Sequence, residues 1–388
     1  INYIILMSTR NHIVLCTQQF NNYWSGLGAY STFLAKGLVQ SGMKVTVISP
    51  GNSMNIEEMD FIPVSLSKHD LTHGGWYSLS YAYAEVIKKV DADLIHFTDA
   101  RESYSYKGNI PAIGTLHDDY FARHKWNPFY YKDDYVDWMK RWLYYSFVTL
   151  TERKALRNLN GLTANSNATA ETVSKAYDIP SEKIKTIYLG LDLDCIPIDD
   201  QLENERLHKP TLLLVGGNVQ RKGLPVILKT MPELLKEIPG LMLQVIGKNQ
   251  NIDRMKKLAD KLGVMDCVEF VGWIPPEKIK TYYRKASVFV MPSLMEGFGL
   301  VFLEAMAQGL PVIGGNVGGT LELIKDGKNG FLVNPGDVST LGEKIRELLI
   351  NLELRRRIIE NGYSTVRKYP AQKMVDNTID LYSNFSHE

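Results

Sequence analysis

The feature that most restricts the fold is a regular alternation of short apolar runs with longer amphipathic stretches along nearly the whole chain. Continuous apolar runs are typical of strands buried on both faces of a parallel sheet, and the stretches between them are typical of covering helices. The sequence predicts strands at 12–17, 44–49, 93–97, 112–116, 161–165, 184–188, 211–215, 241–246, 268–271, 288–291 and 312–314. It predicts helices at 29–41 and 168–177 and near the C-terminus at 371–385. This pattern indicates an α/β protein with doubly wound sheets.

One segment interrupts the alternation. Residues 192–210 are acidic, contain Pro197 and Pro210, and show no clear period. We therefore predict a linker at 192–210 between two α/β halves of similar size. A chain of 388 residues suits two cores better than one, so we expect two Rossmann-like domains, the second at 211–368.

Composition excludes several classes of protein. The formal net charge is +1, which gives no reason to expect nucleic-acid binding. The cysteines Cys16, Cys195 and Cys267 are odd in number and lack metal-ligand spacing, so we predict a reducing compartment and no disulfide framework. No apolar run is long enough to span a bilayer, and we identify no signal peptide. We therefore expect a cytoplasmic protein.

The strongest chemical signal follows the strand predicted at 288–291, where the sequence 291–304 reads MPSLMEGFGLVFLE. Its glycines allow a tight turn, and a helix that begins near Gly299 offers N–H groups to an anionic phosphate. Glu296 lies in the loop and Glu304 on the helix. One carboxylate can bond sugar hydroxyls while the other bonds a ribose. Taken alone, the pair is more simply explained as a turn residue and a solvated helix residue.

This stretch resembles the E-x7-E motif of the family-4 glycosyltransferases of the GT-B fold (glycosyl transferases group 1). The other motifs that match are Gly26-Leu27-Gly28, Asp93-Leu94-Ile95-His96, Thr115-Leu116-His117-Asp118, Asn165-Ser166 and the segments 187–192, 317–322 and 326–333. Each is weak alone, but their order and spacing are specific. The resemblance implies two Rossmann-like domains facing a central cleft. It also implies that the last helix returns to the first domain, which would comprise 1–191 and 369–388.

The resemblance assigns roles to individual residues. Arg221 and Lys222 would hold the donor diphosphate, Glu296 the sugar hydroxyls and Glu304 the ribose, and His117 would contact the donor sugar. Gly26 and Gly28 would lie in a loop whose backbone N–H groups approach the donor diphosphate. Other donor-binding positions would be Gly216, Gly272, Phe298, Gly299 and Leu300. The sequence departs from the family at Gly217, where the family usually has arginine; here an arginine stands beside the lysine instead. Without the family context, the two cations would be read as solvated residues before a helix.

The implied function is retaining transfer of a hexose from a UDP- or GDP-linked donor to a hydroxyl acceptor, such as a glycan, a glycolipid or a lipid-linked precursor. We expect no cofactor and no obligatory metal, because fixed cations can stabilise the departing diphosphate. Two alternatives stay open: a sugar-nucleotide epimerase on the same fold, and a non-catalytic sugar-nucleotide-binding subunit. A dehydrogenase is disfavoured because Ser31 replaces the third glycine of its fingerprint, and no acid follows the strand at 44–49.

Aromatic residues are dense between 120 and 145. A helix pattern from about Asp134 places Tyr135, Trp138, Trp142 and Tyr145 on one stripe. One interpretation is an interfacial helix that gives peripheral membrane contact through 126–148. The other is a helix packed into its domain, with some aromatics lining the acceptor cleft. We favour the packed helix, because interfacial helices usually carry more basic residues on their polar face.

Overall fold

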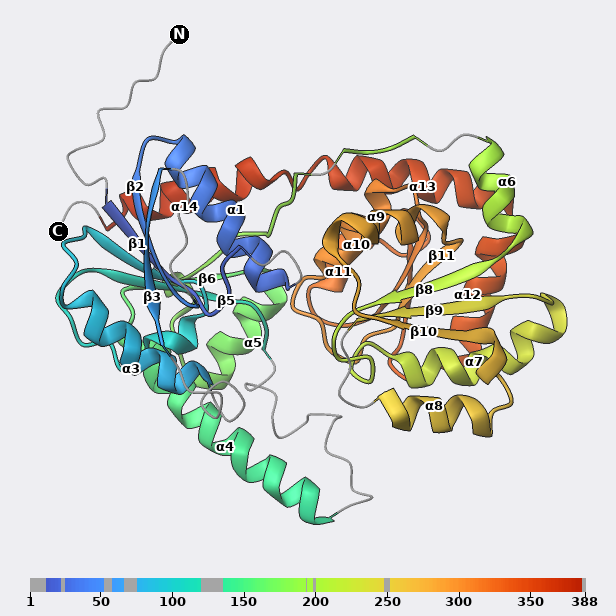
Figure 1. Ribbon diagram of the computed structural model, residues 1–388, viewed down its shortest axis with the longest axis horizontal. Coiled ribbons are helices and arrows are strands. Elements are labelled where there is room, and N and C mark those ends of the chain that lie inside the picture. The colour runs from blue at the N-terminus through green and yellow to red at the C-terminus, as the bar shows by residue number, and fades with distance from the viewer. Residues whose placement is uncertain are drawn as a thin grey trace, which may run out of the picture. The chain divides into compact units, whose positions relative to one another are not determined.

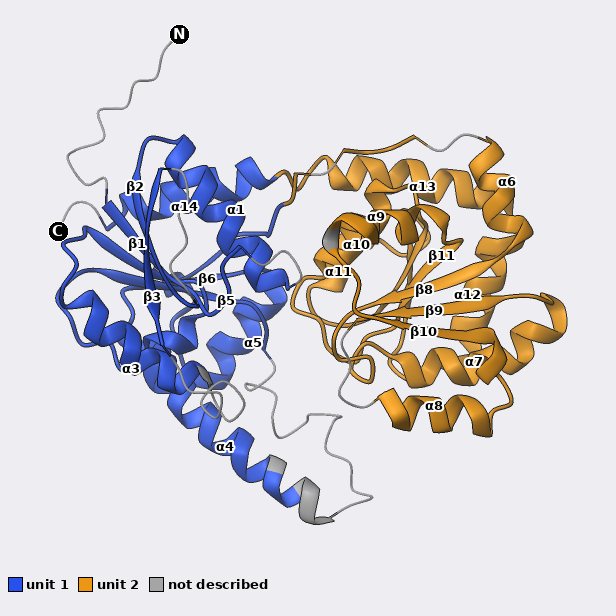
Figure 2. Cartoon of the chain, viewed as in Figure 1, with its two compact units in different colours: residues 1–190, 371–388 blue, residues 191–370 orange. Residues whose placement is uncertain are grey.

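The computed structural model describes residues 12–21, 25–51, 58–65, 75–119, 135–192, 194–197, 200–247 and 252–385. The chain divides into two compact units, Ile1–Gly190 with Ala371–Glu388 and Leu191–Pro370 (Figure 2). Each unit is built around its own parallel sheet with helices on its faces (Figure 1). The predicted pair of Rossmann-like α/β domains is therefore confirmed.

The first unit contains a seven-stranded sheet in the order β3-β2-β1-β4-β5-β6-β7, and all of its strand pairs are parallel. Its strands are β1 (His12–Cys16), β2 (Lys44–Pro50), β3 (Met59–Val64), β4 (Leu94–Phe97), β5 (Ala112–Leu116), β6 (Gly161–Ala164) and β7 (Ile184–Thr186). Its helices are α1 (Gly26–Gln40), α3 (Gly75–Ile87), α4 (Tyr135–Asn158), α5 (Asn167–Tyr177) and α14 (Ala371–Ser383), with 3₁₀ turns η1 (Ala100–Ser103) and η3 (Ser181–Lys183). The central strands are buried throughout, which explains their continuous apolar runs.

The C-terminal helix α14 belongs to the first unit and packs against α1, as the family resemblance implied. Gly37 of α1 allows this close packing, because a Cβ there would collide with Val375. The Tyr382 hydroxyl lies 2.7 Å from His96 Nδ1, and Thr115 Oγ1 lies 2.7 Å from the other ring nitrogen. Burial lowers the pKa of His96 to about 3. His96 is therefore a neutral histidine of the core.

The second unit contains a six-stranded parallel sheet in the order β10-β9-β8-β11-β12-β13. Its strands are β8 (Thr211–Val215), β9 (Met242–Ile246), β10 (Val268–Gly272), β11 (Val288–Met291), β12 (Val312–Gly315) and β13 (Phe331–Val333). Its helices are α6 (Asp200–His208), α7 (Leu224–Glu237), α8 (Ile252–Lys261), α9 (Pro276–Lys285), α10 (Leu300–Ala307), α11 (Thr320–Leu323), α12 (Val338–Ile350) and α13 (Leu352–Val366), with a 3₁₀ turn η4 (Met265–Cys267).

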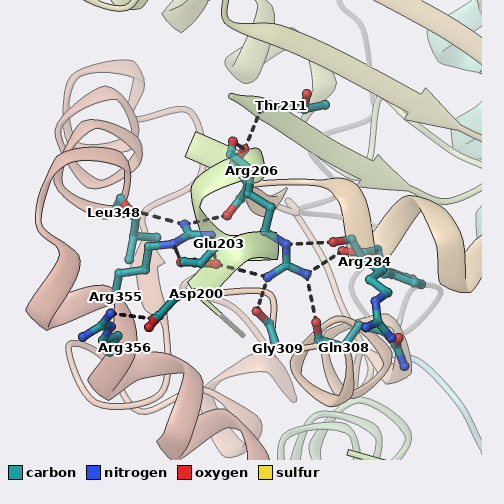
Figure 3. Close-up of polar contacts among 12 residues, drawn as sticks. Asp200, Glu203, Arg206, Thr211, Arg284, Gln308, Gly309, Leu348, Arg355 and Arg356 are labelled. Atoms are coloured by element: carbon teal, nitrogen blue, oxygen red, sulfur yellow. Dashed lines mark hydrogen bonds and ion pairs between the residues drawn. The ribbon is translucent and has the colours of Figure 1, made fainter. Parts of the chain in front are cut away.

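The structure differs from the prediction at 192–210. This segment was expected to be a linker, yet residues 200–208 form helix α6, which is docked within the second unit (Figure 3). Glu203 pairs with Arg355 of α13, and the buried Arg206 donates to main-chain oxygens at the ends of α9 and α10. Those acceptors are Arg284 O at 2.7 Å, Gly309 O at 2.7 Å, Gln308 O at 3.0 Å and Tyr283 O at 3.4 Å. Polar contacts attach this helix, so its sequence shows no apolar period.

Helix α4 corrects a second expectation. Its C-terminal half is packed into the first unit through Val148, Thr151 and Ala155. On the same helix, six large side chains are 40–69% exposed: Met139, Trp142, Leu143, Tyr144, Phe147 and Leu150. The favoured interpretation, a helix packed into its domain, therefore describes Val148, Thr151 and Ala155 but not these six exposed side chains. Residues 120–134 of the aromatic stretch, and the side chains of Tyr135 and Trp138, lie outside the described part.

Candidate functional site

The strand order of the second unit reverses between β8 and β11, and open α/β sheets bind ligands at such a point, beyond the carboxyl ends of the strands. The loop 216–223 follows β8, and the loop 292–299 follows β11. These loops touch: Gly223 has φ 87°, and a Cβ there would collide with the carbonyl oxygen of Pro292. The two segments singled out in the sequence therefore meet at the switch point.

The side chains of Lys222 and Glu296 form the centre of this site. Lys222 Nζ lies 2.5 Å from Glu296 Oε2, and the two side chains are 11% and 10% exposed. The lysine stem runs over Gly216, where an added Cβ would lie 3.3 Å from Lys222 Cγ. Burial acts to raise the pKa of Glu296, but the charges of Lys222 and Arg221 outweigh it and hold that pKa below its usual value. Glu296 is therefore an ionised, paired carboxylate at neutral pH.

Arg221 is tied to the loop that carries Glu296. Its Nη1 donates to Met295 O at 2.9 Å, and its carbonyl oxygen accepts from the amide of Leu294 at 2.8 Å. The Asn218 side chain accepts from the Arg221 amide at 3.1 Å. Main-chain contacts thus fix Arg221 beside the Lys222–Glu296 ion pair, so charged groups are preorganised at this point of the sheet.

Glu304 lies on α10, which begins after Gly299 in the left-handed conformation at φ 95°. The Tyr283 hydroxyl of α9 donates to Glu304 Oε2 at 2.8 Å. Burial raises the pKa of Glu304, although the Tyr283 hydrogen bond and Lys280 oppose that shift. Sequence reasoning missed Tyr283, because no motif connects it with Glu304 along the chain.

The loop after β12 supports the Glu296 loop. The Gly319 amide donates to the Glu296 carbonyl oxygen at 3.1 Å. Gly318 has φ 48°, and a Cβ on it would collide with that same oxygen. The glycines of the 317–322 motif therefore fix the backbone of Glu296.

Three further donor-binding candidates prove to be mainly backbone positions. Phe298 is buried with its ring 5.5 Å from that of Tyr369, and Leu300 is buried in the first turn of α10. What they can offer a ligand is the start of α10, which has no side-chain cap. Gly272, at φ 78°, ends β10, and its carbonyl oxygen accepts from the Gly247 amide at 2.8 Å.

His117 lies in the first unit, beyond β5. Its Nε2 donates to the carbonyl oxygen of Thr98 at 2.7 Å, and its ring packs edge-on to Tyr30 with centroids 4.9 Å apart. Burial lowers the pKa of His117, although Asp99 acts in the opposite direction. The ring is neutral at neutral pH, so it is suited to hydrogen bonding and not to providing a charge.

The glycines near the amino end of the first unit do not form the expected loop. Gly26 is the first residue of α1, and the Gly28 amide donates to Ser25 Oγ at 2.9 Å. Ser25 has extended dihedral angles and acts as the helix N-cap, a role that serine strongly favours. The Gly28 N–H, predicted to approach a diphosphate, is therefore already bonded within the helix cap.

Within the part of the chain that the structure describes, no three or more His, Cys, Asp or Glu side chains cluster so that they could hold a metal ion. Among the same residues, no helix is long and apolar enough to cross a membrane.

Comparison with known proteins agrees with this arrangement. Residues 24–195 match the sequence model of Glycosyltransferase Family 4, and residues 197–365 match that of Glycosyl transferases group 1. The chain belongs to the family-4 glycosyltransferases. The enzyme is 27% identical over 383 residues to an uncharacterised glycosyltransferase of Methanocaldococcus jannaschii, which covers 92% of this chain and 94% of that protein.

One further relative and one solved structure are also similar to this enzyme. It is 30% identical over 185 residues to a GDP-mannose-dependent alpha-(1-6)-phosphatidylinositol monomannoside mannosyltransferase of Mycobacterium tuberculosis, which covers 44% of this chain and 48% of that protein. Its fold matches sucrose-phosphate synthase from Thermosynechococcus elongatus with a TM-score of 0.80 at 21% identity, over 97% and 99% of the two chains. The fold is GT-B, and the enzyme is a glycosyltransferase that uses nucleotide-sugar donors.

Proposed function

We propose that the enzyme transfers a hexose, with retention of anomeric configuration, from a UDP- or GDP-linked donor to a hydroxyl group of a glycan, glycolipid or lipid-linked acceptor. The observation that carries this proposal is the buried Lys222–Glu296 pair beside Arg221 at the switch point of the second sheet. Two cations suit a diphosphate, and a carboxylate suits sugar hydroxyls.

The chemistry follows from where charge develops. As the bond from the sugar C1 to the diphosphate breaks, negative charge accumulates on the leaving oxygen, where Arg221 and Lys222 stabilise it. The acceptor oxygen bonds to C1 on the face that the diphosphate leaves, and its proton passes to a phosphate oxygen. Glu296 holds sugar hydroxyls and Glu304 the ribose, while His117 contacts the sugar. This route requires neither a protein nucleophile nor a metal ion.

The acceptor and location form a second part of the proposal. Exposed Trp142, Leu143 and Phe147 on α4 favour peripheral contact with a membrane, which would bring the enzyme to a lipid-linked acceptor. The mycobacterial relative is named for a phosphatidylinositol-based acceptor. The scattered free cysteines favour the cytoplasmic side.

Product analysis tests the proposal against its two alternatives. The enzyme would be incubated with radiolabelled UDP-glucose, UDP-N-acetylglucosamine or GDP-mannose and a lipid extract, and the anomeric configuration of the product determined by NMR. Transfer with retention is expected. An epimerase would convert the donor into a sugar nucleotide with an altered sugar and transfer nothing, and a non-catalytic subunit would bind the donor and leave it unchanged. An inverted linkage would overturn the mechanism while leaving the transferase class intact.

A further inference from the structure

A cavity of about 570 Å³ lies in the first unit between α3, α4 and the segment that follows η1. Its lining includes Tyr81, Tyr104, Tyr106, Lys88, Lys107 and Lys154. Much of this lining directly precedes β4 and β5, so the cavity faces the amino ends of these strands. Nucleotide-sugar sites of α/β sheets lie at the opposite, carboxyl ends. The cavity is therefore separate from the donor site described above.

An aromatic wall connects this cavity to α4. The ring of Tyr77 lies 5.3 Å from that of Tyr81 and 5.1 Å from that of Tyr104, two residues that line the cavity. On its other side it lies 6.2 Å from the ring of Phe147 on α4. The cavity and the exposed surface of α4 thus form one continuous surface.

Three exposed apolar residues of α4 form a stripe that ends at this cavity. Leu143, Phe147, Leu150 and Lys154 are spaced by four, three and four residues, which places them on one face of a helix. The three apolar members are 55%, 53% and 69% exposed. The Lys154 ammonium lies 4.8 Å from the centroid of the Tyr104 ring at the cavity. An apolar strip therefore leads directly to a cationic end.

The charges around the cavity are predominantly positive. Lys88 pairs with Glu85 at 2.5 Å. Among the described residues, Lys107 and Lys154 have no carboxylate within ion-pair distance. Glu152, the one acid of α4 whose side chain is described, is buried and bonded to Tyr177. Cations and phenol groups are side chains that can bond to a phosphate.

The direction of the pKa shift of Tyr81 agrees with the positive charge around the cavity. Its pKa is lowered by hydrogen bonds with Tyr77 and Ser105 and, to a smaller extent, by the charges of Lys154 and Lys107. The lysine charges therefore act at the place where an anionic ligand would bind.

We propose that the cavity binds the phosphate-bearing headgroup of an anionic membrane lipid while the stripe of α4 enters the adjoining interface of the bilayer. A lipid is favoured over a soluble phosphate because the cationic end continues into exposed apolar side chains, the combination that anionic bilayers recognise. The inference rests on the membrane contact in the proposed function, and is independent of the transfer chemistry.

Vesicle sedimentation tests the headgroup site. The full-length enzyme is mixed with phosphatidylcholine vesicles or with vesicles containing 30% phosphatidylglycerol. The K107Q/K154Q variant is compared with K185Q/K257Q, which removes the same charge at exposed positions elsewhere. Each lysine near a membrane contributes about fivefold to anionic binding, so K107Q/K154Q should bind about thirtyfold more weakly to the anionic vesicles. K185Q/K257Q should change by less than about threefold.

A second pair of measurements separates lipid from soluble anion. The L143S/L150S variant, whose changed side chains are exposed, should lose binding to both kinds of vesicle and keep its circular dichroism spectrum. If it binds like the wild type while millimolar inorganic phosphate competes, the cavity holds a soluble anion and the proposal is wrong. If K107Q/K154Q matches its control, the headgroup site is wrong but membrane contact survives. If the wild type binds no vesicle, both the headgroup site and the membrane contact are wrong. Sugar transfer to a soluble acceptor would then still test the transferase proposal.

Discussion

The hydroxyl of Tyr283 on α9 donates a 2.8 Å hydrogen bond to Glu304 Oε2 on α10. The carbonyl oxygen of the same tyrosine lies 3.4 Å from Arg206 Nη2. One residue thus connects the docked helix α6 with a carboxylate proposed to hold the ribose. This bond fixes the rotamer of Glu304 and partly offsets the rise that burial causes in its pKa.

Replacing Tyr283 by Phe should therefore weaken nucleoside diphosphate binding. Without the hydroxyl, the pKa of Glu304 rises further, so its ionised form is lost at a higher pH as the solution is acidified. Loss of one hydrogen bond predicts roughly a three- to tenfold weaker affinity. Calorimetry between pH 5 and 8 should also show that, on acidification, affinity for the nucleoside diphosphate begins to fall at a higher pH than in the wild type. Tyr282→Phe, on the same helix, is the control, and an unchanged pH profile for Tyr283→Phe would contradict the role.

Replacing Glu296 and Glu304 by Gln should give different losses. The change at Glu296 weakens bonds to sugar hydroxyls and frees Lys222 from its ion partner. Transfer should fall at least about tenfold, while affinity for the free nucleoside diphosphate stays constant or improves. The change at Glu304 should weaken that affinity about tenfold, because the ribose is present in both ligands. Equal weakening by both variants would show that the sugar and ribose assignments are wrong.

The chemistry-bearing segments of the second unit could be predicted from the sequence because local rules determine them. Buried parallel strands produce continuous apolar runs, and the glycines at 216, 223 and 299 occur where φ is positive or neighbouring backbone is close. Tyr283 could not be predicted, since its partner Glu304 is reached only through the packing of α9 on α10.

The predictions that differ from the structure also have specific physical causes. The sequence does not predict helix α6, because Glu203 and Arg206 attach this helix through polar contacts. A helix is recognised in a sequence by the periodic spacing of apolar residues, which α6 lacks. Gly26 and Gly28 were assigned to a loop because a glycine pair resembles a phosphate loop, although Ser25 supplies a helix cap. For α4, the sequence shows which residues share a face, but not whether another element covers that face.

Changing Lys222 to Ala should affect both turnover and stability. Loss of a cation that stabilises the leaving group should cost on the order of 2–4 kcal/mol in transition-state free energy. The buried Glu296 would also lose its partner, so its pKa would rise and the free energy of unfolding near pH 7 would fall. The K222A/E296A variant should recover part of that stability without recovering activity, as measured by chemical denaturation and initial rates. Equal kcat/KM in Lys222→Ala and wild type would exclude the role.

Removal of divalent metal ions should leave activity largely intact. Arg221 and Lys222 are proposed to supply the positive charge that a metal would otherwise place on the diphosphate. Initial rates of transfer would be measured after dialysis against EDTA and again with added Mg²⁺ or Mn²⁺. Complete loss in EDTA that either ion restores would refute metal-independent transfer.

Replacing Arg206 by Met tests the docking of α6 directly. The guanidinium is buried and donates to carbonyl oxygens at the C-terminal ends of α9 and α10, groups that have no partner within their own helices. Removing a buried, multiply bonded charge costs about 3–5 kcal/mol, so the Tm of the second unit should fall by roughly 6–20 °C.

Arg356→Met is the matched control for this change. Arg356 also bonds α6, through Asp200 at 2.9 Å, but both side chains are largely exposed. Such surface pairs contribute about 0–1 kcal/mol, so scanning calorimetry should show a shift of at most about 4 °C. If the two variants unfold at the same temperature, the contacts of Arg206 do not stabilise the second unit, and 192–210 would act as the linker that its sequence suggests.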